Sequence, residues 1–287
     1  MLIQVWHHSQ YEYTAAVTLG IHKLYLIPQH RPYFRIEHQK FQVNPDPDGR
    51  NFRQDLAGNW YQQCWFTGET KSLEIVGEWI FKLQVFNPFG FIIEKDFNDL
   101  GWNHPSFQFS YEERTAFLIP FLKDQEESFF TDFLLEVKKS ASGLVDFLVT
   151  LTRLIHQNWT HEIRHEQNIW DAAYTFAERR GSCRDIALME MEMLRELGLA
   201  ARFVSGYAFN PELEGGHELH AWLEVFLPGA GWVGLDPSLG LFTDHRYIPL
   251  ASHPDPSRTL PVQGTFAGLA DSRLNTRVDI KLLHQGK

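Results

Sequence analysis

The sequence predicts an α+β protein in which a β-rich N-terminal domain precedes a core of helices packed on an antiparallel sheet. Two observations predict this order. Residues 2–86 show strand-like runs of apolar and polar side chains separated by turn-forming segments. The rest of the chain carries apolar stripes at helical spacing, followed by further strand-like segments. We expect the β-rich domain to span residues 1–115 and the core to span residues 116–287.

Strands separated by turns are expected throughout the N-terminal domain. Strand patterns cover parts of Leu2–Leu26 and all of Phe34–Val43, and the turn-rich segment Asn44–Gly49 follows. The aromatic run Trp60–Thr67 and the apolar stretch Leu73–Phe86 supply further strands. This part of the sequence contains neither a phosphate-binding loop nor a metal-ligand spacing. It therefore offers no candidate catalytic site.

Two amphipathic helices are expected to begin the core, after a link at Phe117–Asp124. Ser128–Lys138 and Ser142–Gln157 each carry apolar residues along one stripe at helical spacing. Such stripes are typical of a face buried in the core and do not indicate a cofactor site. A shorter helix, Asp171–Arg180, is expected to lead into the next segment, and Arg273–Leu283 alternates as a last strand would.

The segment from Gly181 to Tyr207 predicts a capped helix followed by a strand. Ser182 is a favourable N-cap residue, and Asp185 three positions later would complete a capping box. Cys183 would then occupy the first helical position. Unpaired backbone N–H groups and the helix dipole favour a thiolate there, which indicates a nucleophile. The alternative is a buried structural cysteine.

A nucleophilic cysteine needs a base and a group that orients the base. One strand pattern carries His220, and the next strand ends at Asp236 after a Pro-Gly-Ala-Gly turn. Adjacent antiparallel strands can bring these two side chains together. Taken alone, each residue is more commonly structural, as a sheet histidine or as a turn aspartate before proline. Their combination with Cys183 indicates a Cys–His–Asp triad.

His161–His165 fits the H-E-x-x-H pattern of zinc proteases. On a helix this pattern would place two histidine ligands on one face. The flanking residues supply no apolar stripe to anchor such a helix, so we expect no metal and no other cofactor in this protein.

Four segments together resemble the bacterial transglutaminase-like superfamily of the cysteine-protease type: Arg179–Asp185, Leu197–Tyr207, Leu219–Val225 and Pro228–Leu241. The resemblance implies a papain-like core behind a β-rich domain. It also implies Cys183 as nucleophile, His220 as base and Asp236 as the orienting group. The sequence departs from relatives at Ile186 and at Ser238–Leu239, neither of which belongs to the triad.

The activity implied by the resemblance is that of a thiol-dependent amide hydrolase or acyl transferase acting on a peptide or protein through a thioester. Two alternatives stay open: a true protein-crosslinking transglutaminase, and a non-catalytic interaction module that retains the fold. The backbone N–H of Cys183 is a candidate oxyanion donor. Trp159 and Trp170 are candidates for the second donor, and Arg164 with Glu166 resembles a structural or substrate-side pair.

The composition limits which partners and which cellular compartment we expect for the protein. A formal net charge of −10 argues against binding to nucleic acid or to an anionic membrane. Two cysteines exclude a disulfide-rich scaffold, and the N-terminus lacks a signal-peptide pattern. No apolar run approaches the 18 or so residues of a membrane-spanning helix. We therefore expect a cytoplasmic protein whose partner is its peptide or protein substrate; the sequence leaves the oligomeric state open.

Overall fold

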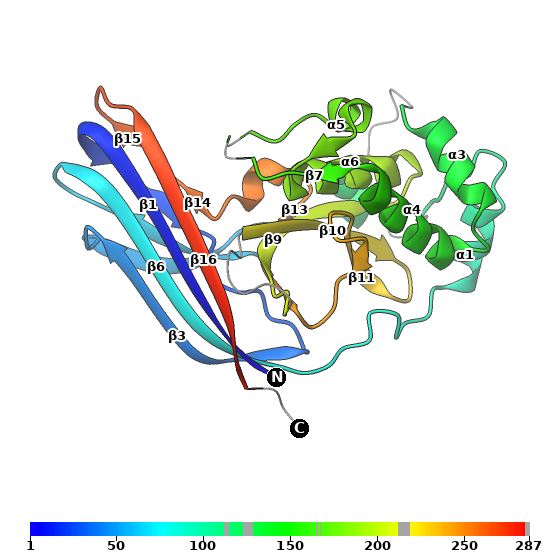
Figure 1. Cartoon of the computed structure of the whole chain (residues 1–287), viewed down its shortest axis with the longest axis horizontal. Coiled ribbons are helices and arrows are strands. Elements are labelled where there is room, and N and C mark those ends of the chain that lie inside the picture. Colours follow the sequence, from blue (N-terminus) through cyan, green and yellow to red (C-terminus); the bar gives the residue numbers. More distant parts are fainter. Residues whose placement is uncertain (112–114, 123–128, 165, 167, 212–218, 285–287) are drawn as a thin grey trace.

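The structure, a computed structural model, describes residues 1–111, 115–122, 129–164, 166, 168–211 and 219–284. It is an α+β fold in which a strongly twisted sheet of long strands stands beside a core of helices and a second sheet (Figure 1). This architecture confirms the predicted fold class. Among the described residues, no helix is both long and apolar enough to span a bilayer.

The large N-terminal sheet is antiparallel and runs in the order β15-β1-β6-β3, with β16 also pairing with β1. Its strands are β1 (Leu2–Leu19), β3 (Phe34–Asn44), β6 (Thr70–Leu83), β15 (Phe266–Ala267) and β16 (Ser272–His284). Alternate residues of β1, from Ile3 to Ser9, are buried, while their neighbours lie on the outer face. This period of two is what the sequence pattern predicts for a sheet with one covered face.

A smaller four-stranded sheet accompanies the large one, in the order β14-β2-β5-β4. Its strands are β2 (His22–Leu24), β4 (Gly49–Gln54), β5 (Trp60–Trp65) and β14 (Val262–Gln263). The predicted strands at residues 34–43, 60–67 and 73–86 thus correspond to β3, β5 and β6, with shifted ends.

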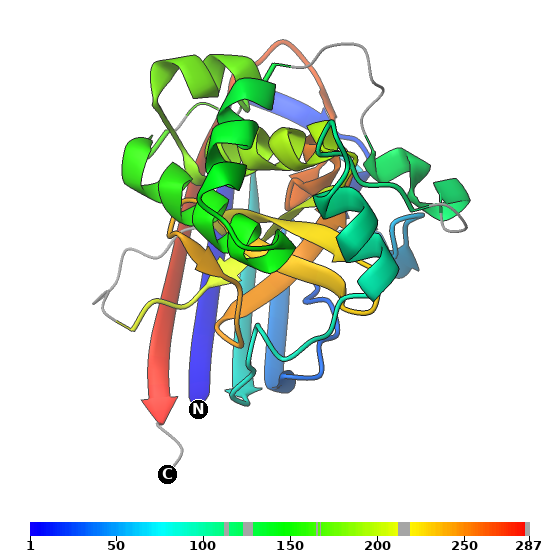
Figure 2. The same cartoon turned by 90° about the vertical axis from the view of Figure 1, so that its right-hand side faces the viewer.

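The core sheet has the order β12-β11-β10-β9-β13. It consists of β9 (Ala201–Ala208), β10 (Leu219–Leu227), β11 (Gly231–Asp236), β12 (Leu241–Phe242) and β13 (Tyr247–His253). Helices cover one face of it (Figures 1 and 2). The principal ones are α3 (Thr131–Lys139), α4 (Leu144–Asn158), α5 (Ala172–Glu178) and α6 (Cys183–Glu196). The two predicted amphipathic helices are therefore confirmed as α3 and α4.

Short elements connect these layers. They are α1 (Lys95–Trp102), α2 (Thr115–Leu118), η2 (Ile119–Phe121), β7 (Thr160–His161), β8 (Arg180–Gly181) and η3 (Pro256–Thr259). The expected link at residues 117–124 is helical as far as residue 121, and its last two residues lie outside the described ones. The helix α1 lies in a segment for which the sequence pattern predicted no element.

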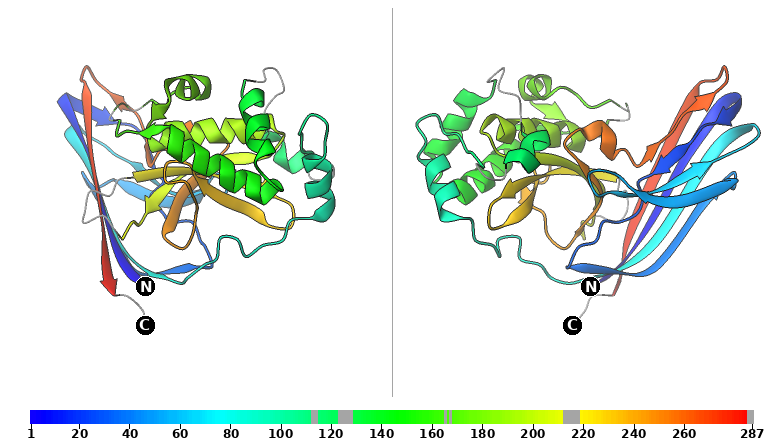
Figure 3. Two further views of the ribbon diagram at one scale, coloured as in Figure 1. Left: turned by 45° about the vertical axis from the view of Figure 1, so that its right-hand side comes forward. Right: turned by 180° about the vertical axis from the view of Figure 1, so that it is seen from behind.

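Two features of the fold cross the predicted domain ranges, which themselves stay a prediction. The C-terminal strand β16 pairs with β1 from Leu2↔His284 to Tyr13↔Ser272, so residues from the two ends of the sequence lie side by side (Figures 1 and 3). In the other direction, Phe107 and Phe109 belong to the apolar core beneath the helices. Alternation along the chain shows that a segment is a strand, but not which sheet it joins.

The inner face of the N-terminal sheet packs directly on the core sheet. Tyr207 of β9 and Ile248 of β13 are fully buried in the apolar cluster formed by β1, β3 and β6. The Tyr207 hydroxyl also bonds Nδ1 of His7 at 3.0 Å, and Nε2 of His7 bonds Ser9 at 2.8 Å. Burial lowers the pKa of His7 to about 4, with a smaller contribution from His8. The ring is therefore neutral at physiological pH.

A fully buried amide, Asn59, joins the small sheet to the core sheet. Its Oδ1 accepts hydrogen bonds from Gln29 Nε2 (2.6 Å) and from the backbone N–H of Ser252 (2.8 Å). Its Nδ2 donates to Asp55 (2.9 Å) and to the carbonyl oxygen of Ser252 (2.9 Å). Both amide hydrogens thus have acceptors, which makes burial of this polar group tolerable.

Replacing Asn59 with alanine should destabilise the protein by at least about 2 kcal/mol, because several buried donors and acceptors then lose their partners. Urea denaturation followed by circular dichroism measures the change. The matched control is Gln54→Ala, which removes an exposed amide from the same hairpin. Equal stabilities for the two variants would show that Asn59 does not join the sheets.

Candidate functional site

The helix α6 begins as the sequence predicts. Ser182 has extended backbone geometry and precedes Cys183, the first helical residue. The backbone N–H of Ser182 donates to the Asp185 carboxylate at 2.8 Å, and the Ser182 hydroxyl donates to the same oxygen at 2.5 Å. The predicted capping box is thereby confirmed, and it places the Cys183 side chain at the positive end of the helix.

Asp185 also fastens the preceding segment to this helix. Its buried carboxylate accepts from Arg164 Nη1 at 2.6 Å and from the backbone N–H of Trp170 at 2.7 Å. Burial alone would raise the pKa of Asp185, but these hydrogen bonds and those from Ser182 lower the pKa below its ordinary value. Arg164 lies 3.7 Å from Glu166 as well, so its closer carboxylate partner is Asp185.

His220 and Asp236 lie together at the ends of neighbouring strands. Leu223 of β10 pairs with Leu235 of β11, which makes Asp236 a diagonal neighbour of His220. His220 Nε2 bonds Asp236 Oδ2 at 2.7 Å, and the Tyr247 hydroxyl donates to the same oxygen at 2.7 Å. The pair that the strand order indicates is therefore formed, with Asp236 fully buried.

The second oxygen of Asp236 is also satisfied. Its Oδ1 accepts from the backbone N–H of Ser238 at 3.0 Å and from the Ser238 hydroxyl at 2.7 Å. Burial would raise the pKa of Asp236, but the charge and hydrogen bond of His220 lower it, with help from Ser238 and Tyr247. Conversely, Asp236 raises the pKa of His220 well above its usual range despite burial of the ring. The pair is thus a carboxylate and an imidazolium.

The Cys183 thiol is partly exposed and lies against this pair. Burial would raise the pKa of Cys183, but hydrogen bonds from His161 and His220 and the charges of both rings lower the pKa to about 6. At neutral pH the sulfur is therefore a thiolate beside an imidazolium. The other cysteine differs: Cys64 is fully buried in β5, and burial raises its pKa to about 11.

His161 is the residue at this site that the sequence interpretation missed. It was considered there only as a zinc ligand, yet its imidazole hydrogen-bonds the Cys183 thiol. His161 lies in the short strand β7, which pairs with β8 immediately before α6. The pairing of β7 and β8 is a tertiary feature of two-residue strands, so no signal in the sequence could have found it.

The zinc-protease pattern does not form its usual helix. His161 is in a strand and Glu162–Arg164 have no helical structure; His165 lies outside the described residues. Over the described part of the chain, no group of three or more His, Cys, Asp or Glu side chains is arranged to hold a metal ion.

The two tryptophans considered as oxyanion donors have other contacts. Nε1 of the buried Trp159 donates to the carbonyl oxygen of Thr175 at 3.1 Å, so its N–H group is already used. The ring of Trp170 lies 4.0 Å from the guanidinium of Arg164. Both residues thus support the segment between α4 and α6. Among the described residues, neither forms a hydrogen bond with the Cys183 thiol.

A fully buried carboxyl, Glu190, lies two turns along α6 from Cys183. Its Oε1 accepts from the Thr152 hydroxyl of α4 at 2.7 Å, whereas Oε2 has no partner in the described structure. Burial raises the pKa of Glu190 to about 8, and the negative charge of Asp236 contributes. Glu190 is therefore protonated at neutral pH and leaves Asp236 as the charged carboxylate near His220.

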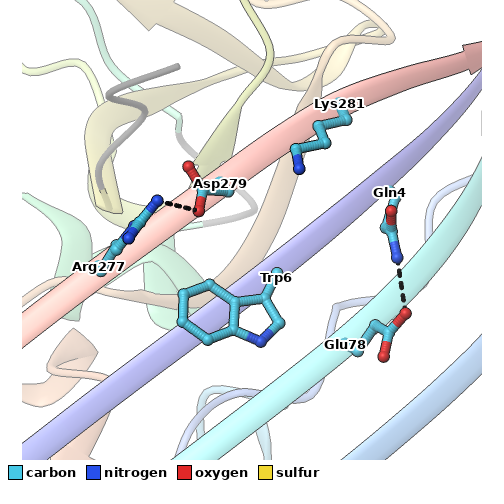
Figure 4. A pocket seen from close by; sticks show the side chains of 6 residues that line it. All are labelled: Gln4, Trp6, Glu78, Arg277, Asp279 and Lys281. Carbon is cyan, nitrogen blue, oxygen red and sulfur yellow. Dashed lines mark hydrogen bonds and ion pairs between the residues drawn. The ribbon is translucent and has the colours of Figure 1, made fainter.

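A pocket lies on the outer face of the N-terminal sheet (Figure 4). Its polar side chains pair with one another: Gln4 donates to Glu78 at 2.6 Å, and Arg277 lies 3.0 Å from Asp279. The pocket is lined by Gln4, Trp6, Glu78, Arg277, Asp279 and Lys281. Because its lining has no thiol, hydroxyl or imidazole group, it does not compete with Cys183 as a candidate for acyl transfer.

Comparison with known proteins matches both parts of the chain to family models. The model of the bacterial transglutaminase-like N-terminal region matches residues 3–80, and that of the transglutaminase-like superfamily matches residues 132–237. The uncharacterized proteins Mb2599c of Mycobacterium bovis and Rv2569c of Mycobacterium tuberculosis are each 25% identical over 297 residues. Each alignment covers 96% of this chain and 91% of the relative.

Among solved structures, a candidate cysteine protease from Cytophaga hutchinsonii superimposes with a TM-score of 0.70 at 17% identity. The match covers 100% of this chain and 92% of that protein. At this identity the likeness shows the shared fold. It extends over both the β-rich region and the helical core, so the two parts occur together in more than one protein.

Brief exposure to iodoacetamide at neutral pH should label Cys183 and leave Cys64 unlabelled, because only the former is both accessible and ionised. The alkylation rate should fall as the pH falls through about 6, where the Cys183 thiolate gains a proton. His220→Ala should move this midpoint upward, since an imidazolium no longer stabilises the thiolate. Peptide mass mapping across pH measures each rate, and preferential labelling of Cys64 would contradict the assignment.

Glu190→Gln should stabilise the protein increasingly as the pH rises. The pKa of Glu190 is 4.5 in an ordinary environment and about 8 in the fold, so the unfolded chain releases its proton first. In the wild-type protein, the stability contributed by protonated Glu190 is therefore fully present below about pH 4.5. As the pH rises from there toward about 8, the free energy of unfolding falls by up to about 1.4 kcal/mol per pH unit. Urea denaturation at several pH values compares the two proteins. A constant difference between them would show that Glu190 is ionised when folded.

Proposed function

The chain belongs to the transglutaminase-like superfamily, and from that premise we propose that it is a thiol-dependent amide hydrolase or acyl transferase. Its substrate would be a peptide or protein, and the reaction would pass through a thioester on Cys183. His220 would be the base and Asp236 the orienting group. The observation that carries the proposal is the hydrogen bond between the Cys183 thiol, at the start of α6, and His220, whose ring in turn bonds the buried carboxylate of Asp236.

The arrangement supports nucleophilic attack by the Cys183 sulfur. Because Nε2 of His220 bonds Asp236, Nδ1 is the ring nitrogen left to face the thiol. Attack on an amide carbonyl forms the S–C bond and moves the carbonyl π electrons onto oxygen. His220 then gives its proton to the departing amine as the C–N bond breaks, which leaves a thioester and a neutral imidazole.

Release of the acyl group reverses these roles. The neutral His220 takes a proton from water or from an amine as that nucleophile attacks the thioester. The tetrahedral intermediate then expels the Cys183 thiolate and restores the ion pair. Asp236 keeps one tautomer and orientation of the ring throughout, and its own bonds to Ser238 and Tyr247 hold it in place. Water makes the protein a hydrolase, and an amine makes it a transferase.

The helix terminus supplies one donor for the oxyanion. Cys183 is the first residue of α6, so its backbone N–H has no acceptor within the helix. Such a group can stabilise negative charge on the carbonyl oxygen of a substrate bound to the same residue. A thiol ionised at neutral pH keeps its reactivity in a reducing compartment, so the cytoplasmic location belongs to the same proposal.

The three proposed catalytic residues should behave as one unit in mutants. Cys183→Ala should abolish acyl transfer, and His220→Ala should cost about as much, because no base remains. Asp236→Asn should lower turnover on the order of 10²–10⁴-fold. In double mutants, the loss of turnover should be smaller than the two single-mutant losses combined. An amide or ester reporter substrate measures turnover, and a labelled primary amine distinguishes transfer from hydrolysis.

The matched control for the cysteine variant is Cys64→Ala, which removes the other thiol and should leave turnover unchanged. Circular dichroism and melting curves check that each variant folds, as the Ser182–Asp185 cap predicts. If reduced, folded wild-type protein reacts with electrophiles no faster than free cysteine does, the enzyme proposal fails. The interaction module would then be the better account.

A further inference from the structure

His161 occupies a fixed position beside the nucleophile. Strand β7 pairs in parallel with β8, with Thr160 opposite Arg180 and His161 opposite Gly181. The backbone N–H of Thr160 donates to the carbonyl oxygen of Arg179, and that of Glu162 donates to Gly181, both at 2.9 Å. Backbone bonds thus hold His161 on both sides, opposite Gly181, which lies two residues before the first residue of α6.

The two imidazoles at the thiol differ in exposure and in support. His220 is largely buried, with 15% of its side chain exposed, and it is bonded to Asp236. His161 is exposed to solvent, and no ion pair among the described residues joins it to a carboxylate. A triad base needs an orienting acid, so His161 does not duplicate the role of His220. Its ring is open to solvent, from which a substrate must approach the sulfur.

A hydrogen-bond donor at this place has a second acceptor during the reaction. While the sulfur is a free thiolate, it accepts the N–H of His161. Once the S–C bond has formed, the negative charge lies on the carbonyl oxygen, two bonds from the sulfur. The sulfur has then lost its negative charge and the carbonyl oxygen has gained it. The N–H group of His161 therefore donates to the oxygen in place of the sulfur. A donor already held in place costs little reorganisation at that moment.

We propose that the His161 imidazole is the second donor of the oxyanion site and acts together with the backbone N–H of Cys183. This role rests on the proposed function. His161 keeps its proton throughout: it donates a hydrogen bond while the electron pair resides on the oxygen. That bond is given up when the C=O group re-forms and the leaving group departs. The proton for the leaving amine still comes from His220.

The test compares two reactions of the same sulfur. Acylation by p-nitrophenyl acetate passes through an oxyanion, whereas alkylation by iodoacetamide displaces iodide and forms none. Both rates scale with the thiolate fraction, so their ratio at one pH is independent of the pKa of Cys183. His161→Phe keeps an aromatic ring without a donor, and His161→Gln keeps an N–H donor. Glu162→Gln alters the neighbouring side chain, which lies 3.4 Å from Arg180, and serves as the matched control.

We expect His161→Phe to lower the acylation-to-alkylation ratio on the order of 10²-fold, as loss of one oxyanion donor does. His161→Gln should recover part of that loss, and Glu162→Gln should leave the ratio unchanged. A ratio that stays constant in His161→Phe, whether both rates fall together or neither falls, would show that His161 acts only on the thiolate or not at all. Alkylation of Cys183 in each variant reports that the site is still folded.

Failure of the proposed function gives a different result. Wild-type protein would then show no burst of p-nitrophenol and no preferential alkylation of Cys183. In that case the inference about His161 falls with the proposal on which it rests. A normal wild-type burst with an unchanged ratio in His161→Phe overturns the inference alone.

Discussion

The packing of α6 against β10 is the contact on which the candidate site depends. Cys183 begins the helix and His220 lies near the start of the strand, so the spacing of their side chains is set by how these two elements meet. The interface is made of apolar residues buried between the helix and the sheet, among them Ala187, Met191 and Leu223. Close packing of this kind resists small displacements, which a nucleophile and its base could not tolerate.

Two buried carboxylates hold the groups of the candidate site in place. Asp185 holds the cap of α6 and the segment before it through bonds to Ser182, Arg164 and Trp170. Asp236 holds His220, and both of its oxygens are otherwise satisfied by Ser238 and Tyr247. A buried charge is costly unless it is paired and hydrogen-bonded, and each of these groups meets that condition. Glu190, whose Oε2 has no partner among the described residues, is instead protonated.

The N-terminal sheet supports the core sheet from behind. Its inner face buries Tyr207 and Ile248 from the core sheet, and Asn59 and His7 make polar bonds across the boundary. These contacts lie behind β9 and β13, the strands that flank β10 on one side of the core sheet. The β-rich region thus stabilises the strand that carries His220 from the side opposite α6. Deleting it would expose a large apolar surface of the core.

The amino-acid sequence by itself determined the local elements that carry the candidate triad. Apolar spacing predicted α3, α4 and α6, since a helix must bury one stripe, and alternation predicted the strands. The capping box was readable because Ser182 and Asp185 interact across one turn. His220 and Asp236 could be paired because their strands are joined by a short turn. All of these are local relationships, which a linear pattern records.

Only the tertiary structure decided the relationships between distant segments. Strand β16 pairs with β1 from the other end of the chain, and Arg164 bonds Asp185 across a connecting segment. His161 reaches the thiol because two-residue strands pair in parallel before α6. Alternation does not specify a strand's partner, and two-residue strands are too short to carry a pattern at all. The environment of Cys183, and with it the ionisation of the thiol, therefore depends on contacts that the sequence does not record.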